Sequence, residues 1–388
     1  MDGPPLYLDN AATSFPKPPA VRAAIIDYMD NNGASAGRGA YREAYLAGEW
    51  LARCRALLAQ LLRIDEASRI AFTLNCTDAL NLALKGTLRR GDHVVTTWMD
   101  HNSILRPLAR MEEEGVITVT RVRASADGCV DPEAIRAACH GRTRMVATLH
   151  ASNVSGSLQD VGAIGGICHE LGILFLLDAA QTIGAMPLYP RELRIDLLAF
   201  PGHKGLMGPL GTGALYHSER VQLRSVREGG TGSRSEEATQ PEFLPDRLEP
   251  GSHNLLGLAG LAAATEEILN RGVVSIYQHK RQLSRAFLDR SKKIAGLTVY
   301  GPTSVEHRVP VFSVALPGWQ PVPAGEVLDR EYGIKARAGL HCAPLAHQTL
   351  RTGPEGALRL SFGALNTLDD VERVALALEA MIQRGPSN

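Results

Sequence analysis

An aspartate and a lysine, each following a predicted buried strand, are the side chains of this sequence best placed to do chemistry. Asp178 follows the apolar segment Ile173–Leu177, and the segment Ile195–Phe200 opens into the sequence Pro-Gly-His-Lys-Gly, whose lysine is Lys204. Ligands of open α/β sheets bind beyond the carboxyl ends of the strands. Lys204 could therefore form an imine with an electrophilic carbonyl, and Asp178 could face a cationic nitrogen.

These two groups together point to a pyridoxal cofactor. Such a cofactor needs a lysine for its aldehyde and an aspartate opposite its pyridinium nitrogen. Taken singly, an aspartate at the end of a strand is more often a turn or capping residue, and a Gly-His-Lys segment is usually a solvated loop. The order and spacing of the remaining motifs must therefore decide.

Short apolar segments that alternate with helical patterns predict the elements that position these groups. This alternation is typical of βαβ units, so we expect a doubly wound α/β fold with a mostly parallel sheet. Val161, Ile164, Ile167 and Leu171 recur at helical spacing between two of the strands. The predicted strands are His93–Trp98, Val116–Val122, Arg144–Leu149, Ile173–Leu177, Ile195–Phe200 and Thr212–His217.

The last third of the chain predicts a smaller α+β domain. Residues 225–251 contain too many glycines and prolines for one regular element, so we expect a long functional loop. Helices follow from about Leu255 and then to about Lys293, and a last helix carries Val371, Val374, Leu378 and Met381 on one face; strands are expected at Val309–Leu316 and Leu358–Phe362. We predict a large domain over residues 15–255 and a small domain from residues 1–14 and 256–388.

Composition excludes several classes of partner. The 388 residues are 45% hydrophobic, and 41 basic residues balance 41 acidic ones, so no global field favours nucleic acid or a membrane surface. We see neither a leader segment nor the roughly 20 apolar residues of a membrane span, and expect a cytoplasmic protein. The six cysteines form no C-x-x-C pair, and we expect no metal site.

Six motifs in order resemble the class V aminotransferase family, most closely its cysteine desulfurase and selenocysteine lyase branch. The resemblance spans nearly the whole chain and implies a fold type I pyridoxal-phosphate enzyme. The motifs are YLDNAAT at residues 7–13, TLNCTDALN at 73–81, Asp100-His101, HASNVSG at 150–156, DAAQ at 178–181 and Gly202-His203-Lys204.

The resemblance assigns a role to each cofactor contact. Thr77, Asp78 and His203 would hold the phosphate, which suits the N-terminus of a helix. His101 would stack on the ring, Asn153 and Gln181 would bond its phenolic oxygen, Asp178 would keep its nitrogen protonated, and Lys204 would carry the Schiff base. Ser252, in Gly-Ser-His-Asn at residues 251–254, would reach the phosphate of a neighbouring subunit, so a homodimer is implied.

The most discriminating residue is Cys342. The sequence RAGLHCAP at residues 337–344 resembles the persulfide-bearing loop of the group II desulfurases. A buried cysteine without a function is the commoner case, but glycine and proline flanks indicate a loop. A reactive thiol needs positive charge nearby, for which Arg337 and His341 are candidates. The resemblance also makes Asn10, Arg337 and Arg359 substrate-binding residues, with Arg359 gripping a carboxylate.

We therefore expect a cysteine desulfurase that converts L-cysteine to L-alanine and leaves sulfur on Cys342 for an acceptor, which could be a protein. The alternatives are a selenocysteine lyase, another β-lyase or a transaminase on the same cofactor, or a sulfur-relay partner with low turnover. The chain departs from the family pattern at several positions, and these leave the identity of the sulfur or selenium amino acid open. They are Pro201, where a phosphate-binding hydroxyl is usual, Ser252, His253, Leu340 and Leu365.

Overall fold

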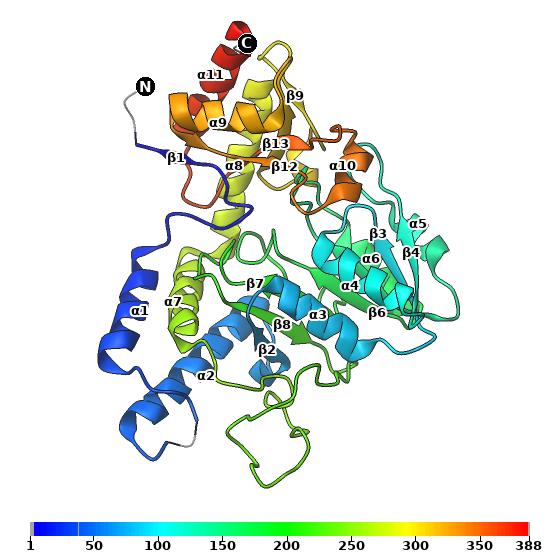
Figure 1. The fold of residues 1–388 in the computed structure, drawn as a ribbon, viewed down its shortest axis with the longest axis vertical. Coiled ribbons are helices and arrows are strands. Elements are labelled where there is room, and N and C mark those ends of the chain that lie inside the picture. The colour runs from blue at the N-terminus through cyan, green and yellow to red at the C-terminus, as the bar shows by residue number, and fades with distance from the viewer. Residues whose placement is uncertain (1–3, 38, 387–388) are drawn as a thin grey trace.

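The computed structural model describes residues 4–37 and 39–386, and its largest element is a seven-stranded sheet (Figure 1). The strand order is β2-β8-β7-β6-β5-β3-β4, and β8 alone runs antiparallel to its neighbours, which confirms the predicted mostly parallel sheet. The sequence analysis missed β2, which is too short for a periodic pattern. The strands are β2 (Ile70–Thr73), β3 (His93–Thr97), β4 (Thr118–Val122), β5 (Thr143–Leu149), β6 (Leu174–Asp178), β7 (Leu197–Pro201) and β8 (Gly213–His217).

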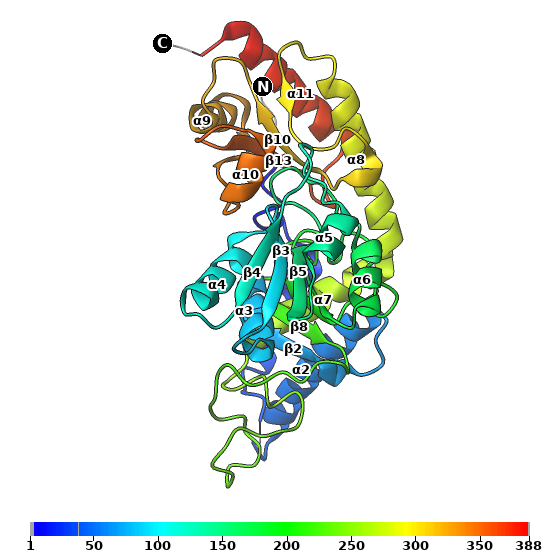
Figure 2. The ribbon, with the colours of Figure 1, turned by 90° about the vertical axis from the view of Figure 1, so that its right-hand side faces the viewer.

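Helices cover both faces of this sheet (Figure 2). Alternate residues of a strand point to opposite faces, so Leu174 and Leu176 pack in one apolar cluster with α3 and α4, whereas Phe175 and Leu177 pack in another with α2, α5, α6 and α7. The helix predicted around Val161–Leu171 is α6. The helices are α1 (Pro19–Asn31), α2 (Arg42–Leu62), α3 (Cys76–Thr87), α4 (Asn102–Glu113), α5 (Pro132–Ala138), α6 (Val161–Glu170) and α7 (Leu255–Arg271), with a 3₁₀ turn η1 (Ala67–Arg69).

A second, smaller apolar core lies between an antiparallel sheet of order β12-β13-β10-β9 and the helices α8, α9 and α11. Strand β1 pairs in parallel with β11, so the N-terminal segment lies against this unit. The boundary at residue 255 stays a prediction. The elements are β1 (Leu6–Tyr7), α8 (Val273–Ser291), β9 (Thr298–Val299), η2 (Val305–His307), β10 (Val311–Ala315), α9 (Pro321–Tyr332), β11 (Ile334–Lys335), β12 (Arg337–Gly339), α10 (Pro344–Leu350), β13 (Ala357–Ser361) and α11 (Leu368–Arg384).

Residues 218–254 contain no helix or strand, as the glycine and proline content predicted. The segment projects from the foot of the molecule in Figure 1. Its last residues are fixed by a buried ion pair in which Glu249 accepts both guanidinium branches of Arg55, at 2.6 and 2.8 Å, and the backbone N–H of Phe72. The residues that follow Glu249 therefore have a defined place beside β2.

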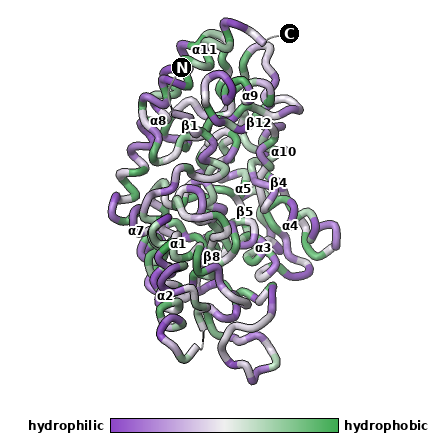
Figure 3. The backbone as a smooth tube through the Cα atoms, turned by 60° about the vertical axis from the view of Figure 1, so that its left-hand side comes forward, coloured by the Kyte–Doolittle hydropathy of each residue, from purple (hydrophilic) through white to green (hydrophobic). Residues whose placement is uncertain are grey.

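Hydrophilic and hydrophobic segments alternate along the surface helices (Figure 3), as expected for helices that bury one face. Within the described part of the chain, no helix is long and apolar enough to cross a membrane. Among the same residues, no group of three or more histidine, cysteine, aspartate or glutamate side chains is placed to hold a metal ion.

Candidate active site

The carboxyl ends of five strands, β2, β3, β5, β6 and β7, converge on one cavity. Asp178 is the last residue of β6, and Lys204 lies three residues beyond the end of β7, as the sequence predicted for neighbouring parallel strands. Seven of the predicted site residues line this cavity together with Asn75, Cys76, Ser103, Leu149 and Pro201. They are Thr77, His101, Asn153, Asp178, Gln181, His203 and Lys204.

Lys204 is held by a loop that only glycine can build. A Cβ atom on Gly202 would lie 2.1 Å from the hydroxyl of Thr212, and one on Gly205 would lie 2.2 Å from the carbonyl oxygen of Ile183. Burial lowers the pKa of Lys204, and the neighbouring carboxylate of Asp178 only partly offsets this effect. The neutral amine, which is the nucleophilic form of lysine, is therefore favoured.

Asp178 is a buried carboxyl group to which none of the cationic side chains in the described part of the chain lies at hydrogen-bond distance. Its Oδ1 atom accepts the backbone N–H of Ala180 at 2.8 Å and the thiol of Cys76 at 3.4 Å. Burial raises the pKa of Asp178, whereas the Ala180 amide and Lys204 lower it. A protonated ring nitrogen against this carboxyl would reverse the shift. The sequence analysis assigned no role to Cys76, since one cysteine inside a motif carries no signal of its contact.

The N-terminus of α3 and the ring of His203 form an anion site at one end of the cavity. Asn75 caps the helix by accepting the N–H of Asp78 at 3.0 Å, while Thr77 lines the cavity. The Nδ1 atom of His203 is buried and has no hydrogen-bond partner within residues 4–37 and 39–386. Free amides and the positive end of a helix dipole attract a phosphate. The Asp78 side chain does not line the cavity but pairs with Arg227 at 3.2 Å.

His101 and Asn153 line another part of the cavity wall. His101 caps α4, with its Nδ1 atom accepting the N–H of Ser103 at 3.1 Å, and burial followed by the charge of Lys204 lowers its pKa to about 4. The ring is therefore neutral at pH 7, as a stacking partner should be. Asn153 donates its amide to the carbonyl oxygen of His341 at 2.7 Å, and its Oδ1 atom is buried without a partner. Gln181 donates to the carbonyl oxygen of Ala11 at 3.0 Å.

This set of groups fits pyridoxal phosphate. The cavity offers a lysine for the aldehyde, a carboxyl group for the ring nitrogen and a helix N-terminus for the phosphate. The buried Nδ1 of His203 and Oδ1 of Asn153 have no hydrogen-bond partners among the residues that the structure describes, and buried polar atoms are rarely left so without a ligand or water.

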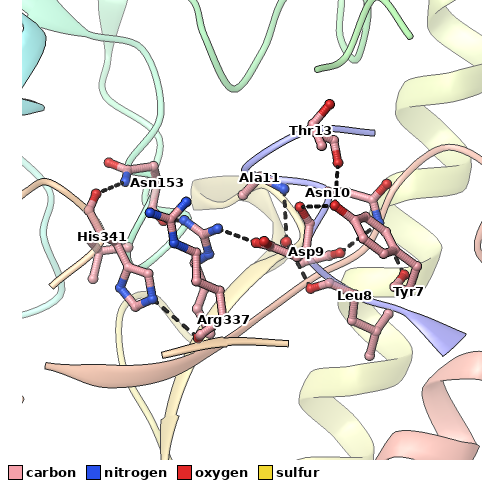
Figure 4. Close-up of polar contacts among 12 residues, drawn as sticks. Tyr7, Leu8, Asp9, Asn10, Ala11, Thr13, Asn153, Arg337 and His341 are labelled. Carbon is pink, nitrogen blue, oxygen red and sulfur yellow. Dashed lines mark hydrogen bonds and ion pairs between the residues drawn. The ribbon is translucent and has the colours of Figure 1, made fainter. Parts of the chain in front are cut away.

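The predicted substrate-binding residues do not line this cavity. Arg359, on β13, is 1% exposed; its Nη1 donates to the carbonyl oxygen of Asn153 at 3.1 Å and its Nη2 to Asp9 at 2.5 Å. Arg337 is its direct partner across β12 and β13, so both side chains project from the same face of the sheet. Figure 4 shows Asp9, Asn153, Arg337 and His341 gathered in one cluster.

Asn10 lies in an adjoining cavity that shares Lys204 and Gln181. Its amide donates to the carbonyl oxygen of Ser361 at 3.0 Å and to Asn366 at 3.2 Å. These bonds hold the N-terminal segment against β13. The sequence analysis missed the pairing of Asp9 with Arg359, because these residues are 350 positions apart in the chain.

Cys342 occupies an exposed turn between β12 and α10, which agrees with the predicted loop. The N–H of Ala343 bonds the carbonyl oxygen of Leu340 at 2.9 Å, and the two central residues, His341 and Cys342, have φ angles of +49° and +57°. Positive φ at both central positions is typical of a type I′ turn, which normally uses asparagine and glycine. Other residues there are strained by on the order of 1–3 kcal/mol each.

The expectation that His341 supplies positive charge to Cys342 is wrong. His341 is 4% exposed, and burial followed by the charge of Arg359 lowers its pKa to about 2. The ring is therefore neutral at any pH at which the protein would work. Of the two predicted charges, only Arg337 remains.

Within a single chain, Ser252 does not line the cavity that holds Thr77 and His203, two of the other predicted phosphate-binding residues. It lines a different cavity, together with Leu74, Gly211, Arg227 and His253. His253 contacts Glu249 through its Nε2 atom at 2.8 Å, which fixes the local chain. A role for Ser252 at a phosphate would require a second copy of the chain.

Lowering the pH from about 6.5 towards 4 should destabilise this fold, because its buried histidines stay neutral only in the folded state. Their folded pKa values lie below the value of about 6.5 in unfolded chains, so the unfolded state binds more protons in that window. The stabilising effect is present above about pH 6.5 and is lost as the pH falls towards 4. The pKa is lowered to about 4 in His101, His150, His203, His217 and His347 and to about 2 in His341.

The measurement is the melting temperature between pH 7.5 and pH 5, where we expect a fall of ~5 °C or more. Burial raises the pKa of Asp100 to about 6 and also raises that of Asp178; these two carboxyl groups act in the opposite direction but are outnumbered by the six histidines. A melting temperature that is constant or rises over this range would contradict the expectation.

The sequence and the fold of this chain are similar to those of known proteins. A family model described as aminotransferase class-V matches residues 6–374. A protein of Methanothermobacter thermautotrophicus named probable cysteine desulfurase is 35% identical, over 98% of this chain and 95% of its own. The apo structure of the cysteine desulfurase from Thermococcus onnurineus has a TM-score of 0.92 at 30% identity, covering 98% of this chain and 95% of that one. The crystal structure of the cysteine desulfurase CsdA from Escherichia coli has a TM-score of 0.87 at 27% identity, covering 98% of this chain and 95% of that one.

Proposed function

The chain belongs to the class V aminotransferase family, and we propose that it is a pyridoxal-phosphate-dependent cysteine desulfurase. Its seven-stranded sheet and smaller α+β unit have the architecture of the fold type I pyridoxal-phosphate enzymes. In this proposal L-cysteine becomes L-alanine, and its sulfur is left as a persulfide on Cys342. The cytoplasm remains our prediction for its location.

Pyridoxal phosphate, when bound, supplies an electron-accepting ring that acidifies the α-carbon of an amino acid. Lys204 and Asp178 would hold its aldehyde and its ring nitrogen. The N-terminus of α3 with Thr77, together with His203, would hold the phosphate, while Pro201 offers no hydroxyl to it. His101, Asn153 and Gln181 line the remaining wall.

Two arginines are proposed to bind the carboxylate of the substrate. Arg359 presents a planar pair of donors suited to a carboxylate, and Arg337 adds a second cation on the same face of the sheet. Since Asp9 already accepts from Arg359 at 2.5 Å, the substrate carboxylate would have to share or displace this contact. The arginine is thus held in position before the substrate arrives.

Lys204 and Cys342 are proposed to perform the two protein-borne steps. Lys204, whose lowered pKa favours the free amine, removes the α-proton of the bound amino acid. The thiolate of Cys342 attacks the sulfur of the substrate, so that an S–S bond forms and the Cβ–S bond breaks. The carbon keeps the electron pair and is protonated, alanine leaves, and the sulfur of Cys342 is oxidised to the persulfide.

The observation that carries the proposal is the attachment of the Cys342 turn to the cavity wall. The carbonyl oxygen of Cys342 accepts the N–H of Asn102, the residue after His101, at 2.9 Å. The carbonyl oxygen of His341 accepts the amide of Asn153 at 2.7 Å. A transaminase has no use for an exposed thiol fixed at this place, whereas a desulfurase requires one.

The test is to incubate the purified, yellow protein with L-cysteine and a reductant and to measure alanine and sulfide. Alanine and sulfide in equal amounts are expected. Selenocysteine is assayed in parallel, since turnover of selenocysteine alone would replace the proposal with a selenocysteine lyase. Alanine that forms only when a sulfur-accepting protein is added would indicate the relay partner, and alanine from neither substrate would refute the desulfurase.

A homodimer is part of the same proposal. Ser252 lies outside the Lys204 cavity of its own chain and lines a different one. Three large apolar side chains close to Ser252 or to the residues that line its cavity are exposed: Leu74, Leu210 and Leu256, at 55%, 66% and 41%. Covering such residues is a common reason for association. Light scattering should therefore give about twice the chain mass of 41.7 kDa, and a monomer mass would exclude a role for Ser252 in a partner's site.

A further inference from the structure

Two histidines are stacked behind the turn that carries Cys342. His341 and His347 have ring centroids 5.3 Å apart and are 4% and 2% exposed. The Nδ1 atom of His341 lies 3.2 Å from the Nε2 atom of His347, and the Nδ1 atom of His347 lies 2.7 Å from the hydroxyl of Thr352. The sequence analysis assigned no role to His347 or Thr352.

The direction of these hydrogen bonds follows from their last acceptor. The Nε2 atom of His341 contacts the backbone carbonyl of Arg337 at 3.3 Å, and a carbonyl oxygen can only accept. Burial lowers the pKa of His341 to about 2 and that of His347 to about 4, so each ring carries one proton at pH 7. His341 is therefore protonated on Nε2 and accepts on Nδ1.

The same reasoning fixes the other histidine. Because Nδ1 of His341 accepts, Nε2 of His347 must be the donor, and Nδ1 of His347 must accept from the hydroxyl of Thr352. Three hydrogen bonds thus form one chain, in which Thr352 donates to His347, His347 donates to His341, and His341 donates to the carbonyl oxygen of Arg337. Each ring has both nitrogens satisfied, which fixes its orientation.

His341 is also the residue through which the turn is attached to the cavity. Its own carbonyl accepts from Asn153, and the next carbonyl, of Cys342, accepts from Asn102. Both central residues of the turn have positive φ, a conformation that persists only where the surroundings enforce it. Moving the His341 ring would therefore release the backbone on both sides of the Cys342 sulfur.

We propose that His347 is a positioning residue: through its hydrogen bond to His341 it keeps the strained turn closed and holds the Cys342 thiol over the cofactor cavity. This inference rests on the proposed function for its catalytic consequence, but the geometry of the turn can be tested without turnover. His347 itself lines neither the cavity that holds Lys204 and Asp178 nor the adjoining one.

The experiment compares His347→Phe, which removes the donor and keeps a planar ring, with His347→Gln, whose amide nitrogen can still donate to His341. In His347→Phe, amide hydrogen exchange at Ala343 and Asn102 should become about tenfold faster, because one buried hydrogen bond no longer supports the turn. The kcat for alanine formation should fall about tenfold, with KM changed by less than about twofold. His347→Gln should restore most of both.

Two further variants keep the test decisive. Thr352→Val removes the first donor of the chain without changing its shape, and should shift both readouts in the same direction as His347→Phe even if the latter folds poorly. His169→Phe, at an exposed histidine of α6, is the matched control and should change neither.

Two results would overturn the inference. One is unchanged exchange at Ala343 and Asn102 in both His347→Phe and Thr352→Val. The other concerns the exchange of the α-proton of L-alanine with D₂O, a reaction that does not need Cys342. If the rate of this exchange fell in His347→Phe and Thr352→Val as much as the kcat for alanine formation, the variants would have damaged the whole site. A wild-type protein that forms no alanine would instead refute the proposed function, while the amide exchange would still decide the role of His347.

Discussion

Lys204→Ala should yield a colourless protein that forms no detectable alanine from L-cysteine. The variant loses both the covalent attachment of the cofactor and the base that removes the α-proton, and general base catalysis alone contributes on the order of 10²–10⁴-fold. The fold should survive, since Lys204 makes no hydrogen bond that supports the sheet and its burial as a cation is unfavourable. The measurements are the absorption spectrum with added cofactor and the rate of alanine formation.

Lys280 provides the matched control. It lines the adjoining cavity, and burial lowers its pKa to about 8, so it is a second amine near Lys204 with enhanced nucleophilicity. Lys280→Ala should keep the yellow colour. A yellow Lys204→Ala protein in the absence of added amines, or a colourless Lys280→Ala protein, would move the attachment site away from Lys204.

Cys342→Ser should separate cofactor chemistry from sulfur transfer. Serine fits the same turn, but its hydroxyl cannot accept a sulfur atom, so alanine formation from L-cysteine should fall by roughly a thousandfold or more. Cofactor binding should be unchanged, because Cys342 does not line the cavity that holds Lys204. The variant should therefore be yellow and should still exchange the α-proton of L-alanine.

Cys129→Ser is the matched control for this variant. Cys129 is partly buried, and burial raises the pKa of its thiol to about 11, so it is protonated and unreactive at pH 7. Activity should be retained. Full activity in Cys342→Ser would favour a transaminase or another β-lyase of the same fold over the desulfurase.

The sequence alone was enough to place Asp178 and Lys204 in one cavity. Buried parallel strands have a recognisable apolar pattern, and their carboxyl ends meet at one edge, so the strand pattern by itself brings Asp178 and Lys204 together. The N-terminus of α3 was predictable from the local sequence as well, because helix starts have local capping signals. These inferences depend only on residues close together in the chain.

Tertiary structure decided the properties that depend on burial and on distant partners. The neutral state of His341 follows from its enclosure by Arg359 and His347, and the sequence had suggested a charged ring. The contact of Asp9 with Arg359 joins the two ends of the chain, and the chain of bonds through His347 requires β12, α10 and the following loop to meet. The sequence could therefore name Cys342 as the candidate nucleophile, but only the tertiary structure places it in a turn with positive φ angles, behind which the ring of His341 is buried and neutral.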